Sequence, residues 1–399
     1  MNFYIRTLGC KMNWLDSARL AAALQTAGHL AVSDETEADF VFVNTCTVTH
    51  EADRKSKQTV NKAGRAQKQV AVMGCGPRVD SEGWQQQAEG ALIFSNDSDM
   101  LAHFGIENDE AQMPLSSRTR LPIAIQTGCD NECSFCITRI ARGTHRSRPQ
   151  EGIIRQVKQA FDHGIKEVVL TGINLAAWGC DNANQPQQAR LHQLIEAILQ
   201  QTEMPRIRLS SLGPQFIQPD FFDVYADARV CDYLHISLQS GSDTVLDRMV
   251  RGHGTAELLK ITERARAVRP DTAIAADMIA GFPGETDEEH QQTLALLGSV
   301  GFAKLHVFPY SERDGTPAAT AANPVGVALR KKRAGEIREL GKTRRRQFIQ
   351  QQWGTTFSGL VEGNGSGLTG NYIRLRSGDL PEGEIHPLKL DETTLLETR

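Results

Sequence analysis

The stretch Ile123-Ala-Ile-Gln-Thr-Gly-Cys-Asp-Asn-Glu-Cys-Ser-Phe-Cys136 joins an apolar strand signal to three cysteines in the spacing C-x-x-x-C-x-x-C. Three thiolates on a tight loop can bind three irons of a 4Fe–4S cluster and leave the fourth iron open. Structural metal sites close with a fourth protein ligand, whereas catalytic sites keep a position free. This loop offers no fourth Cys or His at zinc spacing, the nearest His being His145. Cys129, Cys133 and Cys136 therefore predict an open, reactive cluster, with a zinc site or buried thiols as the alternative.

The whole chain has 399 residues, enough for two to three domains at about 150 residues each. Its composition, 40% hydrophobic and 23% charged, is that of an ordinary globular protein. No apolar run reaches the roughly 18 residues of a membrane span, and residues 1–10 lack the features of a signal peptide. We therefore expect a cytoplasmic protein with no membrane association, in which eight Cys indicate metal binding or catalysis rather than disulfides.

The first segment, residues 1–105, alternates strand and helix signals. Apolar runs predict strands over 3–8, 39–46 and 69–75, and the segments between them predict helices over 16–27 and 50–64. Such alternation is typical of a parallel sheet.

Each of these three strands runs into a cysteine, namely Cys10, Cys46 and Cys75. The carboxyl ends of parallel strands meet at one edge of a sheet, where ligands bind. The topology would therefore bring the three thiols together as a second three-thiolate site. The alternative is that they are ordinary buried core cysteines.

Residues 106–121 are polar and predict a linker, and residues 122–352 repeat a strand-then-helix rhythm. One strand precedes Cys129. Five more strands are predicted, over 166–174, 205–211, 233–241, 272–283 and 304–310. Six such units predict a partial (β/α)6 barrel, whose chemistry would sit at the carboxyl ends of the strands.

The last segment, residues 353–399, predicts small strands at 357–363 and 368–376 between Gly-rich turns. The fold class is therefore α/β with a short C-terminal β segment. Net charge is −4, but residues 330–346 hold nine Lys or Arg against two Glu. That run is either a solvated helix face or a patch that attracts a phosphate backbone.

The chain resembles the methylthiotransferase family of radical S-adenosylmethionine (SAM) enzymes over nearly its whole length. The strings that carry the resemblance are Thr7-Leu-Gly-Cys-Lys-Met-Asn13, Asn44-Thr-Cys46, Gly74-Cys75, Leu238-Gln-Ser-Gly-Ser-Asp243 and Gly281-Phe-Pro-Gly-Glu-Thr286. Further strings resemble the branch that acts on N6-threonylcarbamoyladenosine beside the tRNA anticodon. These are Ile140-Ala-Arg-Gly143 with Arg146-Ser-Arg-Pro149, Leu170-Thr-Gly-Ile-Asn-Leu175 with Trp178-Gly179, and Phe308-Pro-Tyr-Ser-Glu-Arg-Asp-Gly-Thr-Pro-Ala318.

The resemblance implies a transferase with two 4Fe–4S clusters, one on Cys129, Cys133 and Cys136 and the other on Cys10, Cys46 and Cys75. SAM would serve both as radical source and as methyl donor. The radical would remove the hydrogen from carbon 2 of the adenine ring, where the methylthio group is then placed. The cofactors carry this chemistry, and the protein aims it. The residues implied to contact SAM are Phe135, Thr171, Gly172, Asn174, Gln239, Asp277 and Gly281, with barrel packing or helix capping as the alternative for each.

The resemblance also implies partners. The anticodon loop of tRNA would be the substrate, because its unpaired bases can be splayed out and read. The last segment resembles a short TRAM domain, in which Tyr372, Arg374 and Arg376 would form an RNA surface. An electron donor such as flavodoxin or ferredoxin and a monomeric state are expected, whereas the sulfur donor is not identified.

Three alternatives stay open. In the first two, the chain is a sibling enzyme of the same family, and its substrate is either isopentenyladenosine in tRNA or an aspartate of a ribosomal protein. Outside that family, the chain would be a non-catalytic iron–sulfur protein that binds RNA or senses redox state.

Overall fold

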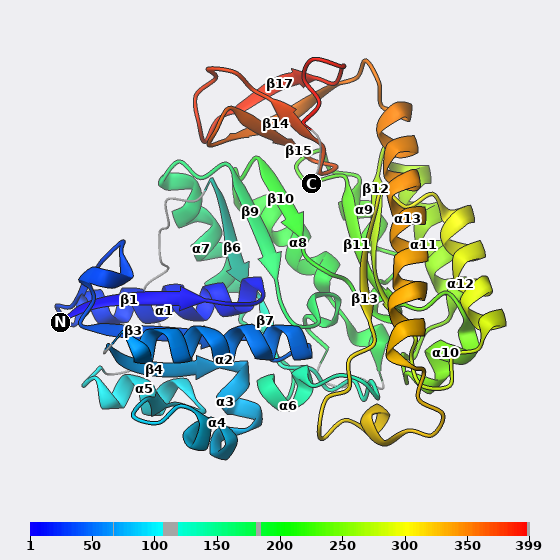
Figure 1. Ribbon diagram of the computed structural model, residues 1–399. Coiled ribbons are helices and arrows are strands. Elements are labelled where there is room, and N and C mark those ends of the chain that lie inside the picture. The colour runs from blue at the N-terminus through cyan, green and yellow to red at the C-terminus, as the bar shows by residue number, and fades with distance from the viewer. Residues whose placement is uncertain (67, 107–118, 181–184, 397–399) are drawn as a thin grey trace.

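The computed structural model describes residues 1–66, 68–106, 119–180 and 185–396 (Figure 1). Most of the predicted linker over 106–121 lies outside the described residues. The described chain forms a parallel α/β sheet, a second and larger set of parallel strands with helices, and a C-terminal antiparallel sheet. The predicted α/β fold class is confirmed.

The N-terminal sheet has the strand order β2-β1-β3-β4-β5, and all its pairs are parallel. Its strands are β1 (Asn2–Thr7), β2 (Leu30–Ala31), β3 (Phe40–Thr45), β4 (Gln69–Gly74) and β5 (Leu92–Ile93). The central strand β3 is buried along its whole length, as expected for a strand covered on both faces. One face buries Phe3, Phe42 and Met100, and the other buries Val43, Val60 and Trp84.

The helices of this part are α1 (Lys11–Thr26), α2 (His50–Arg65), α3 (Cys75–Val79), α4 (Ser81–Gln87) and α5 (Asp97–His103). Helix α1 begins directly after Cys10, earlier than the sequence predicted. Helix α2 begins where its N-cap Thr49 accepts a hydrogen bond from the Ala52 amide, which satisfies a donor of the first turn. Helices α1, α2 and α3 each follow a strand that ends near a cysteine.

The six predicted barrel strands are all present and parallel, in sequential order. They are β6 (Arg120–Ala124), β9 (Glu167–Thr171), β10 (Arg206–Leu209), β11 (Tyr233–Gln239), β12 (Ala273–Ala280) and β13 (Lys304–Pro309). Isolated parallel bridges from Ile207 to Val230 and from Leu212 to Ile236 link the first three strands to the last three. Within the described residues no pairing joins β13 to β6, so the barrel is open, as predicted.

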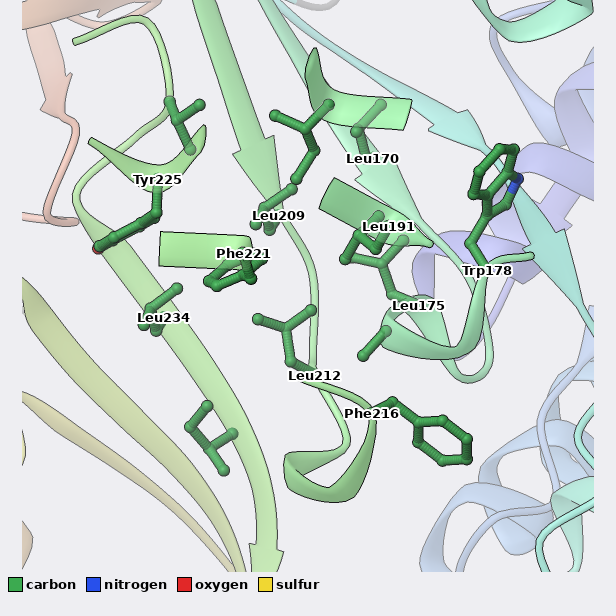
Figure 2. Close-up of a cluster of buried hydrophobic side chains, with 14 of the residues drawn as sticks. Leu170, Leu175, Trp178, Leu191, Leu209, Leu212, Phe216, Phe221, Tyr225 and Leu234 are labelled. Atoms are coloured by element: carbon green, nitrogen blue, oxygen red, sulfur yellow. The ribbon is translucent and has the colours of Figure 1, made fainter. Parts of the chain in front are cut away.

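The helices that cover the barrel are α7 (Gln150–Asp162), α8 (Leu191–Gln201), α9 (Phe221–Tyr225), α10 (Asp243–Arg248), α11 (Thr255–Val268), α12 (Asp287–Val300) and α13 (Val327–Gln351). Figure 2 shows how their side chains meet those of the strands in one apolar cluster. Leu170 and Leu209 come from strands, Leu191 and Phe221 from helices, and all are nearly or fully buried. Burying one such side chain stabilises the fold by about 1.5–3 kcal/mol.

The C-terminal sheet is antiparallel, in the order β16-β15-β14-β17. Its strands are β14 (Thr356–Glu362), β15 (Ser366–Thr369), β16 (Arg374–Arg376) and β17 (Ile385–Lys389). The stretch 368–376 is therefore split between two strands. The turn between them holds Tyr372 at φ +62°, a conformation that non-glycine residues rarely adopt.

A buried ionic network joins this sheet to the amino ends of the barrel strands. Glu167 pairs with Arg206 at 2.8 Å and with Arg208 at 2.6 Å. The two guanidinium groups also donate to backbone carbonyls of the C-terminal sheet, including those of Ser358 and Thr369. Burial opposes the charge of Glu167, but Arg208 and Arg206 outweigh it and lower its pKa to about 2.

We expect Glu167→Gln to lower the free energy of unfolding by about 3–5 kcal/mol, because it leaves two buried guanidinium groups without their counter-charge. Urea unfolding of the purified protein at neutral pH measures this effect. Glu203→Gln is the matched control, since Glu203 is exposed, and it should change stability by less than about 0.5 kcal/mol. An equal effect of the two substitutions would contradict a role for Glu167 in docking the sheet.

The same carboxylate predicts a pH dependence. Its pKa is lower in the folded chain than its ordinary value of 4.5, so its ionised form stabilises the fold above that pH. The contribution should disappear as the pH falls from 4.5 towards 2, and this component should be missing in Glu167→Gln. Unfolding curves of both proteins across that range provide the comparison.

Candidate active site

The loop from Cys129 to Cys136 follows β6 and the short strand β7 (Gln126–Thr127), which pairs with β8 (Arg146–Ser147). Gly128 enters the loop at φ +69°, and a Cβ atom there would lie 1.7 Å from the Thr144 carbonyl oxygen. Only glycine fits this approach. The Cys129 amide then donates to the Gly143 carbonyl at 3.0 Å, which closes the loop onto the end of helix α6 (Thr138–Arg142).

The far side of the loop is tied to the segment after α10. The Ser134 amide donates to the Met249 carbonyl at 3.0 Å, and the Ser134 hydroxyl donates to the Arg248 carbonyl at 2.9 Å. Arg251 donates to the Cys133 sulfur at 3.1 Å. Burial and the nearby thiols of Cys133 and Cys136 together raise the pKa of Cys129 to about 11. The thiols of Cys133 and Cys136 thus lie within electrostatic range of Cys129, and Arg251 places a cation at Cys133.

The three N-terminal cysteines also come together, as the sheet topology predicted. Asn13 Oδ1 lies 3.6 Å from the Cys10 sulfur and 3.7 Å from the Cys75 sulfur. Gly9 packs so closely that a Cβ atom would lie 2.7 Å from the Cβ of Cys46. Burial raises the pKa of both Cys46 and Cys75, and neighbouring thiols raise each further.

All six of these cysteines are free thiols. In the part of the chain that the structure describes, no set of three or more His, Cys, Asp or Glu side chains is arranged to hold one metal ion. The ligands of a cluster bind different irons and so lie farther apart than the ligands of a single ion.

The two cysteine sets are joined by a contact between helices far apart in the sequence. Helix α3 begins at Cys75 and packs against α6, which follows Cys136 (Figure 1). Arg142 of α6 crosses this contact and donates to Asp16 at 2.6 Å and to Asn13 at 2.5 Å. Sequence reasoning gave no role to either Arg142 or Asn13, although both lie in strings that carry the resemblance.

The segment after β9 holds three residues predicted to contact SAM. Gln126 organises it, because its side-chain oxygen accepts hydrogen bonds from the Ile173 and Asn174 amides, each at 2.9 Å. A Cβ atom on Gly172 would lie 2.7 Å from that oxygen, so a larger residue here would displace the Gln126 side chain. Thr171 and Asn174 are both buried at this carboxyl end of the strand.

Two more of the predicted residues lie at strand ends in unusual backbone geometry. Gln239 ends β11 at φ +81°, next to a shift in its register with β12. Gly281 follows β12 at φ +73°. Glycine adopts a positive φ without strain. Gln239 does not, and backbone strain of that kind is concentrated at functional sites. Phe135 lies edge-on to Phe282, with ring centres 6.5 Å apart, and so joins the loop to the segment after β12.

Asp277 lies in the interior of β12. Its Oδ1 atom accepts a hydrogen bond from His235 Nε2 at 2.9 Å. The His235 ring stacks on that of His306 with centres 4.9 Å apart. Burial and the nearby His235 together lower the pKa of His306 to about 4. The sequence gave no indication of this pair of imidazoles.

The expected RNA surface is also corrected. The Tyr372 ring lies 4.2 Å from the ring of Tyr233 and 4.2 Å from the Arg208 guanidinium, so it serves the contact with the barrel. Arg374 pairs with Glu362 at 2.5 Å, whereas Arg376 is exposed. This sheet lies at the amino ends of the barrel strands, at the end of the barrel opposite α6 (Figure 1).

The basic run on α13 is only partly available to a ligand. Arg330 and Arg333 are buried and paired with Glu312 and Glu285. The exposed cations of the run are Lys331, Lys332, Arg338, Lys342 and Arg346. Neither of the two readings of this run, as a solvated face or as a phosphate patch, therefore holds for all of its residues.

Two family models match this chain. Residues 123–297 match the family model described as Radical SAM superfamily, and residues 2–95 match the one described as Uncharacterized protein family UPF0004. The radical S-adenosylmethionine methyltransferase TsrM from Kitasatospora setae, solved with cobalamin and a 4Fe-4S cluster, shares the fold. Its TM-score is 0.59 at 14% identity, over 84% of each chain. The fold and the three-cysteine loop thus define a radical SAM enzyme, a class that uses SAM and a 4Fe–4S cluster.

Curated relatives indicate the family within this class of enzymes. Threonylcarbamoyladenosine tRNA methylthiotransferase MtaB of Rickettsia prowazekii is 33% identical, over 93% of this chain and 90% of the relative. The tRNA-2-methylthio-N(6)-dimethylallyladenosine synthase of Pelobacter propionicus is also 33% identical, over 91% of this chain and 88% of the relative. The chain therefore belongs to the methylthiotransferase family of radical SAM enzymes. None of the helices in the described ranges has the length and apolar character to cross a membrane.

Proposed function

We propose that this methylthiotransferase acts on tRNA and adds a methylthio group to carbon 2 of N6-threonylcarbamoyladenosine next to the anticodon. The observation that carries the proposal is the meeting of two grouped sets of three free cysteines at the contact between α3 and α6. Transfer of a sulfur group to an unactivated ring carbon requires a radical source and a sulfur carrier at one base. Holding both centres at one contact makes the two steps effectively intramolecular.

Cys129, Cys133 and Cys136 are assigned to a 4Fe–4S cluster that binds SAM. When bound, the two cofactors supply the one-electron chemistry that opens a C–H bond. The chain's own part is to fix the loop through Ser134 and Gly128. The proposed SAM contacts are Phe135, Thr171, Gly172, Asn174, Gln239, Asp277 and Gly281, all from the loop or from the barrel strands and the segments that follow them.

Cys10, Cys46 and Cys75 are assigned to a second 4Fe–4S cluster that presents the sulfur. Their burial differs, since Cys46 and Cys75 are buried and Cys10 is exposed. An exposed ligand at the rim of such a site leaves room for a substrate base to approach. We place this cluster in a unit of residues 1–105, the barrel in residues 122–352, and an RNA contact in residues 353–399.

The tRNA substrate is supported by the names of relatives of both branches, which match this chain equally well. The preference for threonylcarbamoyladenosine rests on the strings around Thr171 and Pro309. Exposed Arg376 and the five exposed cations of α13 supply positive charge for a phosphate backbone. We further propose a cytoplasmic monomer that takes electrons from a flavodoxin or a ferredoxin.

Mass spectrometry of nucleosides from tRNA tests the substrate. In a strain lacking this gene, 2-methylthio-N6-threonylcarbamoyladenosine should be lost and its unmodified precursor should accumulate, and the gene supplied in trans should restore the product. Loss of the methylthio derivative of isopentenyladenosine instead would assign the sibling activity. No change in either nucleoside would contradict a tRNA substrate.

A further inference from the structure

Arg142 is placed where one side chain can act on the N-terminal cysteine set from the radical SAM loop. It is 6% exposed, yet it ends the helix that follows Cys136. Its two terminal nitrogens are occupied by Asp16 and Asn13. The oxygen of Asn13 that accepts from Arg142 is the same atom that faces the Cys10 and Cys75 sulfurs.

The third nitrogen of this guanidinium, Nε, has no hydrogen-bond partner among the described residues. The Nε–H of Arg142 is buried and makes no hydrogen bond within the protein. A buried donor left unpaired costs about 1–3 kcal/mol, so native structures seldom keep one without a reason. The side chain lies within interaction range of Cys75, whose thiolate its charge favours. The guanidinium that carries the empty donor is therefore a neighbour of Cys75.

A guanidinium remains charged even when it is buried. Removal from water opposes the charge of Arg142, but Asp16 and Cys75 hold its pKa above its ordinary value. The chain thus keeps a buried, permanent positive charge within electrostatic range of Cys46 and Cys75. Charge and hydrogen bonds to sulfur are the protein's means of setting the potential of an iron–sulfur cluster.

We propose that Arg142 is a positioning residue for the second cluster: its Nε–H donates to a sulfur atom there, and its charge, oriented by Asp16, raises the cluster's reduction potential. This inference rests on the proposed function, because it requires a cluster on Cys10, Cys46 and Cys75. It goes beyond that function by assigning control of the sulfur-carrying site to a residue of the SAM-binding loop region. A residue next to the SAM-binding cysteines thus sets the charge environment of the second cluster.

An anaerobic redox titration followed by electron paramagnetic resonance tests this directly. The protein is the full chain with Cys129, Cys133 and Cys136 all replaced by Ala, so that only the second cluster is observed. In this background, Arg142→Gln should make the cluster at least tenfold harder to reduce, a shift of about 59 mV to more negative potential for one electron. Arg142→Lys keeps the charge but loses the Nε–H, and should shift the potential less.

Asp16→Asn guards against the case in which Arg142→Gln fails to fold. It removes the counter-charge of Arg142, so it should move the potential in the positive direction, which a purely structural defect would not do. Arg139→Gln, an exposed arginine of the same helix, is the matched control and should leave the potential unchanged. Unchanged potentials in both Arg142→Gln and Asp16→Asn would overturn the inference alone. Absence of any cluster in the parent protein would overturn the second cluster itself, and the inference with it.

Discussion

Replacing Cys133 with Ala is expected to abolish the reductive cleavage of SAM, with formation of 5′-deoxyadenosine falling by more than about 100-fold. Cys133 lies in the loop that Gly128 and Ser134 hold in place, and Arg251 donates to its sulfur at 3.1 Å. Loss of one of three thiolates leaves too few ligands for a cluster with one open iron. Incubation of the reconstituted protein with SAM and dithionite, followed by chromatography, measures the product.

Cys180→Ala is the control for this substitution, because Cys180 is buried outside both cysteine sets. It should retain SAM cleavage within about twofold of the unsubstituted enzyme. Cys129→Ala and Cys136→Ala should match Cys133→Ala. Normal cleavage in any of these three variants would contradict the assignment of the loop.

The second large effect is expected for Cys46→Ala, which should keep SAM cleavage and lose the methylthio product. Cys46 follows β3 and packs against Gly9, far in sequence from the SAM loop but grouped with Cys10 and Cys75. Its removal takes a ligand from the sulfur carrier and leaves the radical site intact. Product analysis by mass spectrometry and 5′-deoxyadenosine formation should therefore separate in this variant, and iron content should fall by about half.

The comparison variant is again Cys180→Ala, which should keep both activities and the full iron content. A Cys46→Ala protein that still forms the methylthio nucleoside would show that sulfur does not come from this site. A protein that loses SAM cleavage together with sulfur insertion would show that the two sites are not independent. Either result contradicts the division of labour proposed for the two cysteine sets.

The three long strands of the N-terminal sheet and the six barrel strands could be predicted, because strands covered on both faces read as continuous apolar runs. The two-residue strands β2 and β5 were not predicted, since two residues are too few to form a pattern. Strand β3 is an example, since all of its residues are buried. The grouping of Cys10, Cys46 and Cys75 followed from topology alone, since parallel strands end at one edge. Local chemistry and a general rule of sheet geometry were sufficient for these features.

Other features depend on contacts that a single sequence does not encode locally. Arg142 binds Asp16, which lies 126 positions away, and nothing near either residue indicates the pairing. The left-handed turn at Tyr372 is combined with its contacts to Arg208 and Tyr233, both from the barrel. Those contacts also explain why an aromatic residue that looked suited to stack on RNA is used to dock the sheet.

The basic run of 330–346 shows the same limit. Composition indicated one positively charged surface, but tertiary contacts with Glu285 and Glu312 bury Arg333 and Arg330. Long side chains can pair with distant carboxylates wherever packing brings them, so a count of charges does not locate a surface. Within this run, only the cations left exposed on α13 remain candidates for RNA contact.

The most direct test of the proposed chemistry is isotope transfer from the substrate. An anticodon stem–loop RNA carrying threonylcarbamoyladenosine, deuterated at carbon 2 of the adenine, is incubated anaerobically with the reconstituted enzyme, SAM and a reductant. The account predicts deuterium in the 5′-deoxyadenosine and a methylthio group on the nucleoside, both seen by mass spectrometry. Unlabelled 5′-deoxyadenosine together with an unchanged nucleoside would contradict it.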